Sequence, residues 1–120
     1  MDSSIKLSVV FIMILSFLQA SSVQIVNNLP GGLLLTIHCK SKDDDLGIHE
    51  ISSGNQWGFP FKPNIWGTTL FFCSFQWPGS FYHFDVYDDG RDHGRCSYCV
   101  WNIKPTGPCL YNKLCEAWNP

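Results

Sequence analysis

The sequence predicts an all-β fold, a small disulfide-stapled antiparallel β-sandwich of about seven or eight strands. Several short segments alternate apolar and polar residues, turn-forming residues separate them, and the chain has six cysteines. With 120 residues, 45% hydrophobic and 15% charged, the composition is that of one globular domain. Helix should be minor or absent, because 10 Gly and 7 Pro would interrupt most helical stretches.

Residues 1–22 are expected to be a secretory signal peptide. Lys6 precedes an apolar run from Leu7 to Leu18, and small residues follow it. Cleavage is expected after Ala20 or Ser22, leaving residues 23–120 as a single domain. The run is too short for a membrane anchor and no second one follows, so we expect a secreted, extracellular protein with no membrane insertion.

The expected strands follow from the alternation of apolar and polar residues along the mature chain. The first strand is expected at 23–28, and the second at 33–40, where Leu35, Ile37 and Cys39 share one face. The strongest strand is 68–77, which places Phe71 and Phe75 on one face. Turn residues bound the remaining expected strands, which are 56–61, 81–87, 97–104 and 108–111.

All six cysteines are expected to form disulfides, because an exported domain of this size has a marginal core. Six cysteines allow 15 pairings, and the sequence does not choose among them. Cys96 and Cys99 point to opposite faces if both are extended, so we do not expect them to pair with each other. A redox role or a zinc site for these two is disfavoured, since a strand follows them and no second ligand pair has the required spacing.

The net charge and the titratable residues argue against several classes of function. The net charge of −2 lacks the basic excess of a nucleic-acid binder. We expect no enzyme activity and no cofactor, because the four histidines form no recognisable catalytic signature. His49-Glu50 and Asp92-His93 remain an alternative acid-base pair, as in a secreted hydrolase. Asp43-Asp44-Asp45 could ligate calcium, although a turn offset by neighbouring lysines is the preferred interpretation, so no metal site is expected.

The charged segment 88–95 is the candidate recognition loop. Its polarity predicts that it projects into water, and loops on a rigid sandwich commonly carry binding surfaces. The residues proposed for it are Asp88, Asp89, Gly90, Arg91, Asp92, His93 and Arg95. Trp57, Trp66, Trp77 and Trp101 lie in apolar settings and are expected in the core, whereas Trp118 is expected to be free.

Five stretches together resemble the plant self-incompatibility S-protein family, over most of the mature chain. These are His38-Cys39-Lys40-Ser41-Lys42-Asp43-Asp44-Asp45-Leu46-Gly47, Phe59-x-Phe61, the run from Gly67 to Trp77, Phe84-Asp85-Val86-Tyr87, and Cys99-Val100-Trp101-Asn102-Ile103 with Gly107-x-Cys109. The resemblance implies a small secreted β-sandwich. The founding members of the S-protein family are ligands secreted by the stigma, and a membrane receptor on incompatible pollen recognises them.

By this resemblance, Cys39 would pair with Cys109 and Cys73 with Cys99, leaving Cys96 and Cys115 for a third bridge. The resemblance also aligns the segment 88–95 with a variable hydrophilic loop. We therefore expect a monomeric signalling ligand that binds a plasma-membrane receptor protein in cell-cell recognition. A secreted defence or inhibitor protein is the alternative.

Overall fold

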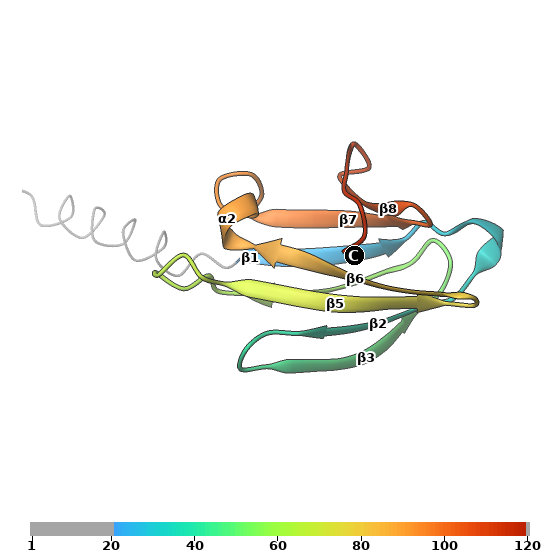
Figure 1. Cartoon of the computed structure of the whole chain (residues 1–120), viewed down its shortest axis with the longest axis horizontal. Helices are drawn as coiled ribbons and strands as arrows, with labels where there is room; N and C mark the ends of the chain where they lie inside the picture. The colour runs from blue at the N-terminus through green and yellow to red at the C-terminus, as the bar shows by residue number, and fades with distance from the viewer. Residues whose placement is uncertain (1–20, 120) are drawn as a thin grey trace, which may run out of the picture.

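Two stacked β-sheets make up the computed structural model, which describes residues 21–119 (Figure 1). The first sheet has the strand order β4-β1-β7-β8-β9, and the second has the order β3-β2-β5-β6. The strands of the first sheet are β4 (Gln56–Phe61), β1 (Ser21–Asn27), β7 (Tyr98–Lys104), β8 (Gly107–Leu110) and β9 (Leu114–Cys115). Those of the second are β3 (Asp45–Ile51), β2 (Leu35–Lys40), β5 (Leu70–Trp77) and β6 (Ser80–Asp88). The predicted all-β sandwich is confirmed.

The core lies between the sheets and consists of the alternating side chains of their strands. In β5, Phe71 and Phe75 are buried, as the alternation predicts. In β2, Leu35 and Ile37 face the same core. Trp101 of β7 is fully buried among them and donates from Nε1 to the carbonyl oxygen of Val86 at 2.8 Å. The buried indole N–H is therefore satisfied.

Four elements differ from the prediction, and residues 21–119 contain nine strands rather than seven or eight. One of the four is β9, which has only two residues and therefore no alternation that could predict it. The edge strand β3 was not predicted, because its Asp and Gly residues favour a turn. Its alternation is also weak, since only its last residue, Ile51, is buried. The short helix α2 (Asp89–Asp92) lies inside the charged segment, and η1 (Pro30–Gly32) is a single 3-10 turn. The sheets are also not wholly antiparallel, since β1 and β7 pair in parallel.

The disulfide pairing expected from the resemblance is wrong. The structure joins Cys39 to Cys73, Cys96 to Cys99 and Cys109 to Cys115. Two of the bridges join residues directly opposite each other on neighbouring strands, with Cα–Cα distances of 4.0 Å for the first and 3.9 Å for the third. Because each pair lies directly across neighbouring strands, its Cα atoms are well within the limit of about 7 Å beyond which a disulfide would need movement of the backbone.

The prediction that Cys96 and Cys99 do not pair with each other is also wrong. It assumed that both residues are extended, but Cys96 precedes β7 and a bend at Ser97 intervenes. The bend brings the two Cα atoms to 5.3 Å. All six cysteines are paired in the structure, as expected.

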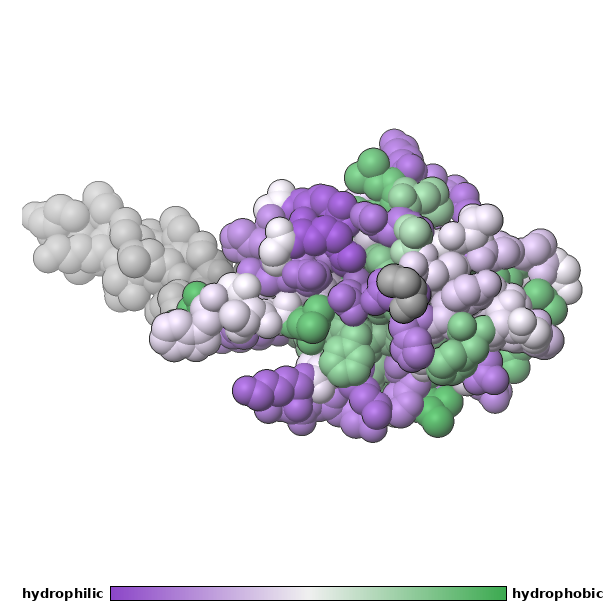
Figure 2. Space-filling view, viewed as in Figure 1, coloured by the Kyte–Doolittle hydropathy of each residue, from purple (hydrophilic) through white to green (hydrophobic). Residues whose placement is uncertain are grey.

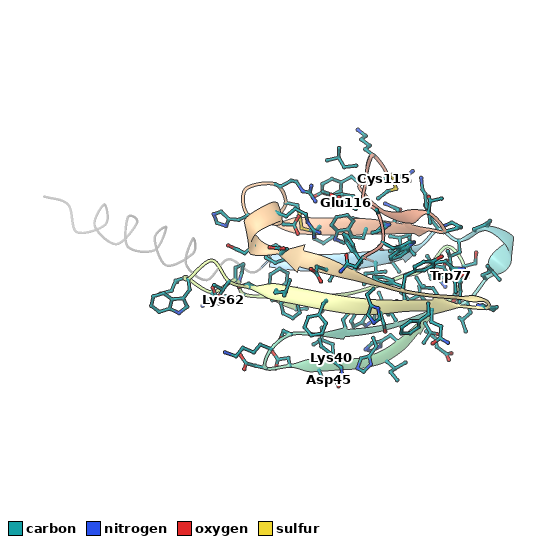
Figure 3. All side chains as sticks on the ribbon, in the orientation of Figure 1. Lys40, Asp45, Lys62, Trp77, Cys115 and Glu116 are labelled. Carbon is teal, nitrogen blue, oxygen red and sulfur yellow. A yellow bond between two sulfur atoms is a disulfide. The ribbon has the colours of Figure 1, made fainter. Side chains whose placement is uncertain are left out.

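The C-terminal tail, residues 116–119, connects the two sheets (Figure 3). The Glu116 backbone N–H donates to the carbonyl oxygen of Pro108 in β8, and that of Asn119 donates to the carbonyl oxygen of His83 in β6. Between these points the Trp118 ring stacks on Tyr82, with centroids 4.9 Å apart. The tail therefore packs against the edge strand β6 and joins the two sheets on that side of the sandwich.

The expected signal peptide falls mostly on residues 1–20, which lie outside the described residues. Ser21 and Ser22 belong to β1, where Ser22 pairs with Pro60 and Tyr98. Cleavage after Ala20 would leave this strand whole, whereas cleavage after Ser22 would remove two of its residues. Within residues 21–119 the structure contains no helix with the length and apolarity to cross a bilayer.

Candidate functional site

Three connections gather at one end of the sandwich, the end where β1 begins (Figure 1). They are the β2–β3 turn (residues 41–44), the β4–β5 loop (residues 62–69) and the segment 89–97 that contains α2. Lys62 marks the base of the middle one in Figure 3. We call this the loop end; a rigid sandwich holding several loops together is a common way to build a binding surface.

The β4–β5 loop presents two large apolar side chains to solvent. Trp66 is 79% exposed and Ile65 is 72% exposed. Asn64 holds the loop in shape: its Oδ1 accepts from the backbone N–H groups of Trp66 and Thr68 at 3.1 Å each, and its Nδ2 donates to Thr68 Oγ1 at 3.0 Å. Asparagine is a favoured residue for such a turn, because its side chain bonds its own backbone.

Two open clefts flank the β4–β5 loop, and Trp66 lines both. The larger, of about 960 Å³, lies between this loop and the segment 89–97, and Tyr87, Asp89 and His93 are among its lining residues. The smaller, of about 600 Å³, lies between the loop and the β2–β3 turn. Figure 2 shows the strongly hydrophilic turn projecting separately from the loop, with a hollow between them.

The tryptophan prediction is correct for Trp77 and Trp101, which are buried, but wrong for two others. Trp66 is exposed, whereas Trp118 is half-buried and packs on Phe75 and Tyr82. A sequence signal for Trp66 was present, because it lies between the turn-forming pair Pro63-Asn64 and Gly67, which adopts a φ of +72°.

The charged segment is only partly the exposed loop that its composition predicts. Asp92 has no solvent exposure and Asp89 is 8% exposed, so the prediction that they project into water is wrong. Gly90 and Gly94 are exposed, and the His93 side chain is 80% exposed. Asp88 forms the N-cap of α2 and accepts from the Gly90 N–H at 3.0 Å.

Asp92 is buried because two arginines surround it. Arg91 donates from Nε and Nη2 to the two carboxylate oxygens, at 2.8 and 2.6 Å. Arg95 Nη2 lies 3.0 Å from Asp92 Oδ1, and its Nη1 lies 3.5 Å from Glu116 of the tail. The Arg91 guanidinium also lies 4.9 Å from the Phe84 ring centroid. These charges hold α2 on the sandwich, and none of the Asp92 carboxylate is open to a partner.

The pKa values of two residues at the loop end, Tyr87 and Arg91, are raised above their ordinary values. Burial, together with the charge of Asp89 and its acceptance of the Tyr87 hydroxyl hydrogen bond at 3.2 Å, raises the pKa of Tyr87 to about 12. Burial opposes the charged form of Arg91, but the hydrogen bond and charge of Asp92 outweigh it, so the pKa of Arg91 lies above its ordinary value.

The alternative acid-base pair is not assembled. His49 belongs to β3, stacks on Trp57 with centroids 4.2 Å apart, and lines a separate cleft. His93 lies in the larger cleft of the loop end. In the calcium alternative, Asp45 is already engaged: the Gly47 N–H and His38 bond its carboxylate and lower its pKa. No group of three potential metal-ligating side chains occurs within residues 21–119.

A known protein family matches nearly all of the described chain. The model of the family described as plant self-incompatibility protein S1 matches residues 22–119. The chain belongs to this family. Among S1-family relatives, S-protein homolog 5 of Arabidopsis thaliana is 53% identical over 100 residues, which cover 82% of this chain and 78% of the relative. S-protein homolog 3 of the same plant is 45% identical over 107 residues, covering 81% and 71%.

A solved structure supports the S1-family fold. That structure belongs to the SPH (Self-Incompatibility Protein Homologue) proteins, described as "a widespread family of small, highly stable, secreted proteins from plants". It superposes with a TM-score of 0.58 at 18% identity, covering 85% of this chain and 98% of the other. At the loop end of this S1-family chain, Ile65 and Trp66 are the large apolar side chains most exposed to solvent.

Proposed function

We propose that this protein is a secreted signalling ligand that binds a plasma-membrane receptor through its loop end, in cell-cell recognition. Membership of the plant self-incompatibility S1 family supports the class of function. The expected signal peptide and the description of the solved relative as secreted support an extracellular location. Self-incompatibility itself is one use of such a ligand, and another plant signalling role is equally compatible with this surface.

The observation that carries the proposal is the exposure of Ile65 and Trp66 on an ordered loop. Removing apolar side chains of this size from water is energetically favourable, so a partner that covers them would gain binding energy. Tryptophan is also enriched among the residues that dominate binding energy. Because Asn64 already fixes the loop, binding would cost little conformational entropy. The flanking clefts provide room for side chains of the partner.

Within segment 88–95, we propose that only the exposed residues contact the receptor. Gly90 and His93 face solvent, and Arg95 lies partly exposed in the larger cleft. Asp92 serves the fold instead, so a substitution there would confound folding with binding. Variants for a binding experiment should therefore come from the β4–β5 loop.

The test is saturable binding of labelled, oxidised mature protein to intact plant cells, with unlabelled variants as competitors. We expect wild-type protein to displace the label and the double variant Ile65→Ser/Trp66→Ser to lose at least about tenfold in competition, as for a hot-spot residue. The matched control is Ile48→Ser/Phe81→Ser, which removes two exposed apolar side chains from the second sheet.

Two results would count against the proposal. Absence of saturable binding on all reproductive and vegetative cell types would oppose a receptor ligand and favour the defence or inhibitor alternative. Equal competition by the loop variant and the control would place the contact surface elsewhere.

A further inference from the structure

We propose that the larger cleft of the loop end receives a lysine or arginine side chain of the partner protein. The aliphatic stem would lie against Trp66, and the charged head would reach the Asp89 carboxylate. This inference rests on the proposed function and adds to it the chemistry of the partner's contact residue.

Asp89 supplies the carboxylate of the proposed site. It is 8% exposed, yet it lines the cleft. Its Oδ1 accepts from the Tyr87 hydroxyl at 3.2 Å, whereas Oδ2 has no hydrogen-bond donor among residues 21–119. Gly67 lies beside this oxygen: a Cβ there would lie 3.2 Å from Oδ2, so a side chain at position 67 would crowd it.

The charge balance around the cleft leaves Asp89 as the unneutralised group. Arg91 and Arg95 are both bound to Asp92, and Arg95 also reaches Glu116. These two cations and two carboxylates balance one another. The remaining cationic candidate, His93, is mostly exposed at the rim, and its Nδ1 lies 3.8 Å from Asp89 Oδ1. A nearly buried carboxylate without a full countercharge is costly, and a partner cation would offset that cost.

Trp66 supplies the second half of the site. Trp66 lines the cleft that contains Asp89, from a loop that Asn64 holds in place. Lysine and arginine lay their methylene stems along apolar surfaces while the charged head reaches a polar group, and their cations are attracted to an indole face. An apolar wall beside a carboxylate therefore matches both parts of a basic side chain.

Other occupants fit less well. An acidic side chain or a phosphate would meet the Asp89 carboxylate, and repulsion between like charges opposes its entry. A purely apolar side chain would remove water from the carboxylate without providing a hydrogen bond, which is unfavourable. A basic side chain satisfies the free oxygen and covers the indole at the same time.

The test titrates the oxidised mature protein with N-acetyl-arginine methylamide and N-acetyl-lysine methylamide, followed by ¹H–¹⁵N NMR. The indole N–H of Trp66 and the backbone N–H of Gly67 report on the cleft. We expect both basic amides to shift these signals saturably, and increasing salt to weaken the effect. The neutral control of similar shape is N-acetyl-norleucine methylamide, and the acidic control is N-acetyl-glutamate methylamide.

Variants connect the effect to the two residues. Asp89→Asn keeps the size of the side chain and an acceptor for Tyr87, and should weaken basic-amide binding at least about tenfold, as expected for loss of a charge-assisted contact. Asp44→Asn, on the exposed β2–β3 turn, is the matched control and should bind as the wild type does. Trp66→Ala gives an independent readout, followed through Gly67, because this exposed ring adds little to folding.

The inference is overturned if the norleucine or glutamate amide shifts the reporters as strongly as the basic amides do, or if Asp89→Asn binds like the wild type. Its failure is separable from that of the proposed function. A protein that binds cells but ignores basic amides contradicts only this inference. A protein that takes up basic amides but binds no cell contradicts the receptor proposal.

Discussion

Arg91 forms a two-pronged contact with Asp92, donating to each of the two carboxylate oxygens of a residue that is inaccessible to solvent. Asp92 Oδ2 also accepts from the Asp88 backbone N–H at 3.0 Å. A short helix of polar composition thereby becomes part of the folded body of the protein. Bidentate arginine-carboxylate pairs combine favourable energy with a fixed geometry.

We predict that Asp92→Ala destabilises the protein by about 3 to 5 kcal/mol, because it leaves two arginines without their shared carboxylate. Urea unfolding of the oxidised protein measures this. The control Asp43→Ala removes an exposed carboxylate and should change the free energy of unfolding by less than about 0.5 kcal/mol. Similar losses in the two variants would show that the buried network contributes little.

We predict that stability falls at alkaline pH as Tyr87 ionises. Since its pKa rises from 10.0 to about 12 in the folded state, this contribution is fully present below pH 10 and is lost as pH rises from 10 through 12. Unfolding free energies measured across this window should fall more steeply in the wild type than in Tyr87→Phe. Parallel curves for the two proteins would contradict the assignment.

The three disulfides should differ in their effect on stability. Cys39–Cys73 closes a sequence separation of 34 residues and Cys96–Cys99 one of 3. By the loop-entropy relation, losing the first costs about 4 kcal/mol and losing the second about 2 kcal/mol. Paired Cys→Ala variants, compared by thermal and urea unfolding, measure this order.

Peptide mapping under non-reducing conditions tests the connectivity itself. It should recover the pairs Cys39–Cys73, Cys96–Cys99 and Cys109–Cys115. A peptide joining Cys39 to Cys109 would instead restore the pairing implied by the family resemblance and refute the register of β2 and β5 at this point.

We predict that Trp118→Ala costs about 2 kcal/mol, less than for a fully buried tryptophan, because the ring is half-buried against Phe75 and Tyr82. The same substitution at exposed Trp66 is the control and should cost less than about 0.5 kcal/mol. Equal losses at both positions would mean that the tail does not seal the core.

The sequence was sufficient for the fold class because alternation in β2, β5 and β7 is strong and core-facing residues such as Ile37 and Phe75 are buried as expected. It was insufficient for the disulfides. Alternation shows which face a cysteine occupies, but pairing depends on the register between strands, which brings Cys39 opposite Cys73.

The site was harder to predict than the fold. The composition of segment 88–95 indicates a solvated loop, yet Asp92 is buried because Arg91 and Arg95 converge on it in space. An apolar setting likewise suggests a buried Trp66, although the ring belongs to a turn that Asn64 organises. In both cases contacts between side chains decide exposure, and a one-dimensional pattern does not contain them.

The two ends of the described chain differ in their suitability for labels and surface attachment. Ser21 lines the larger cleft, so a fluorophore, affinity tag or fusion partner attached before it would crowd the proposed contact surface. Asn119 is held against β6, away from the loop end (Figure 1). Attachment through a linker after the last residue would leave the loops free, and probes for cell binding should be built in that orientation.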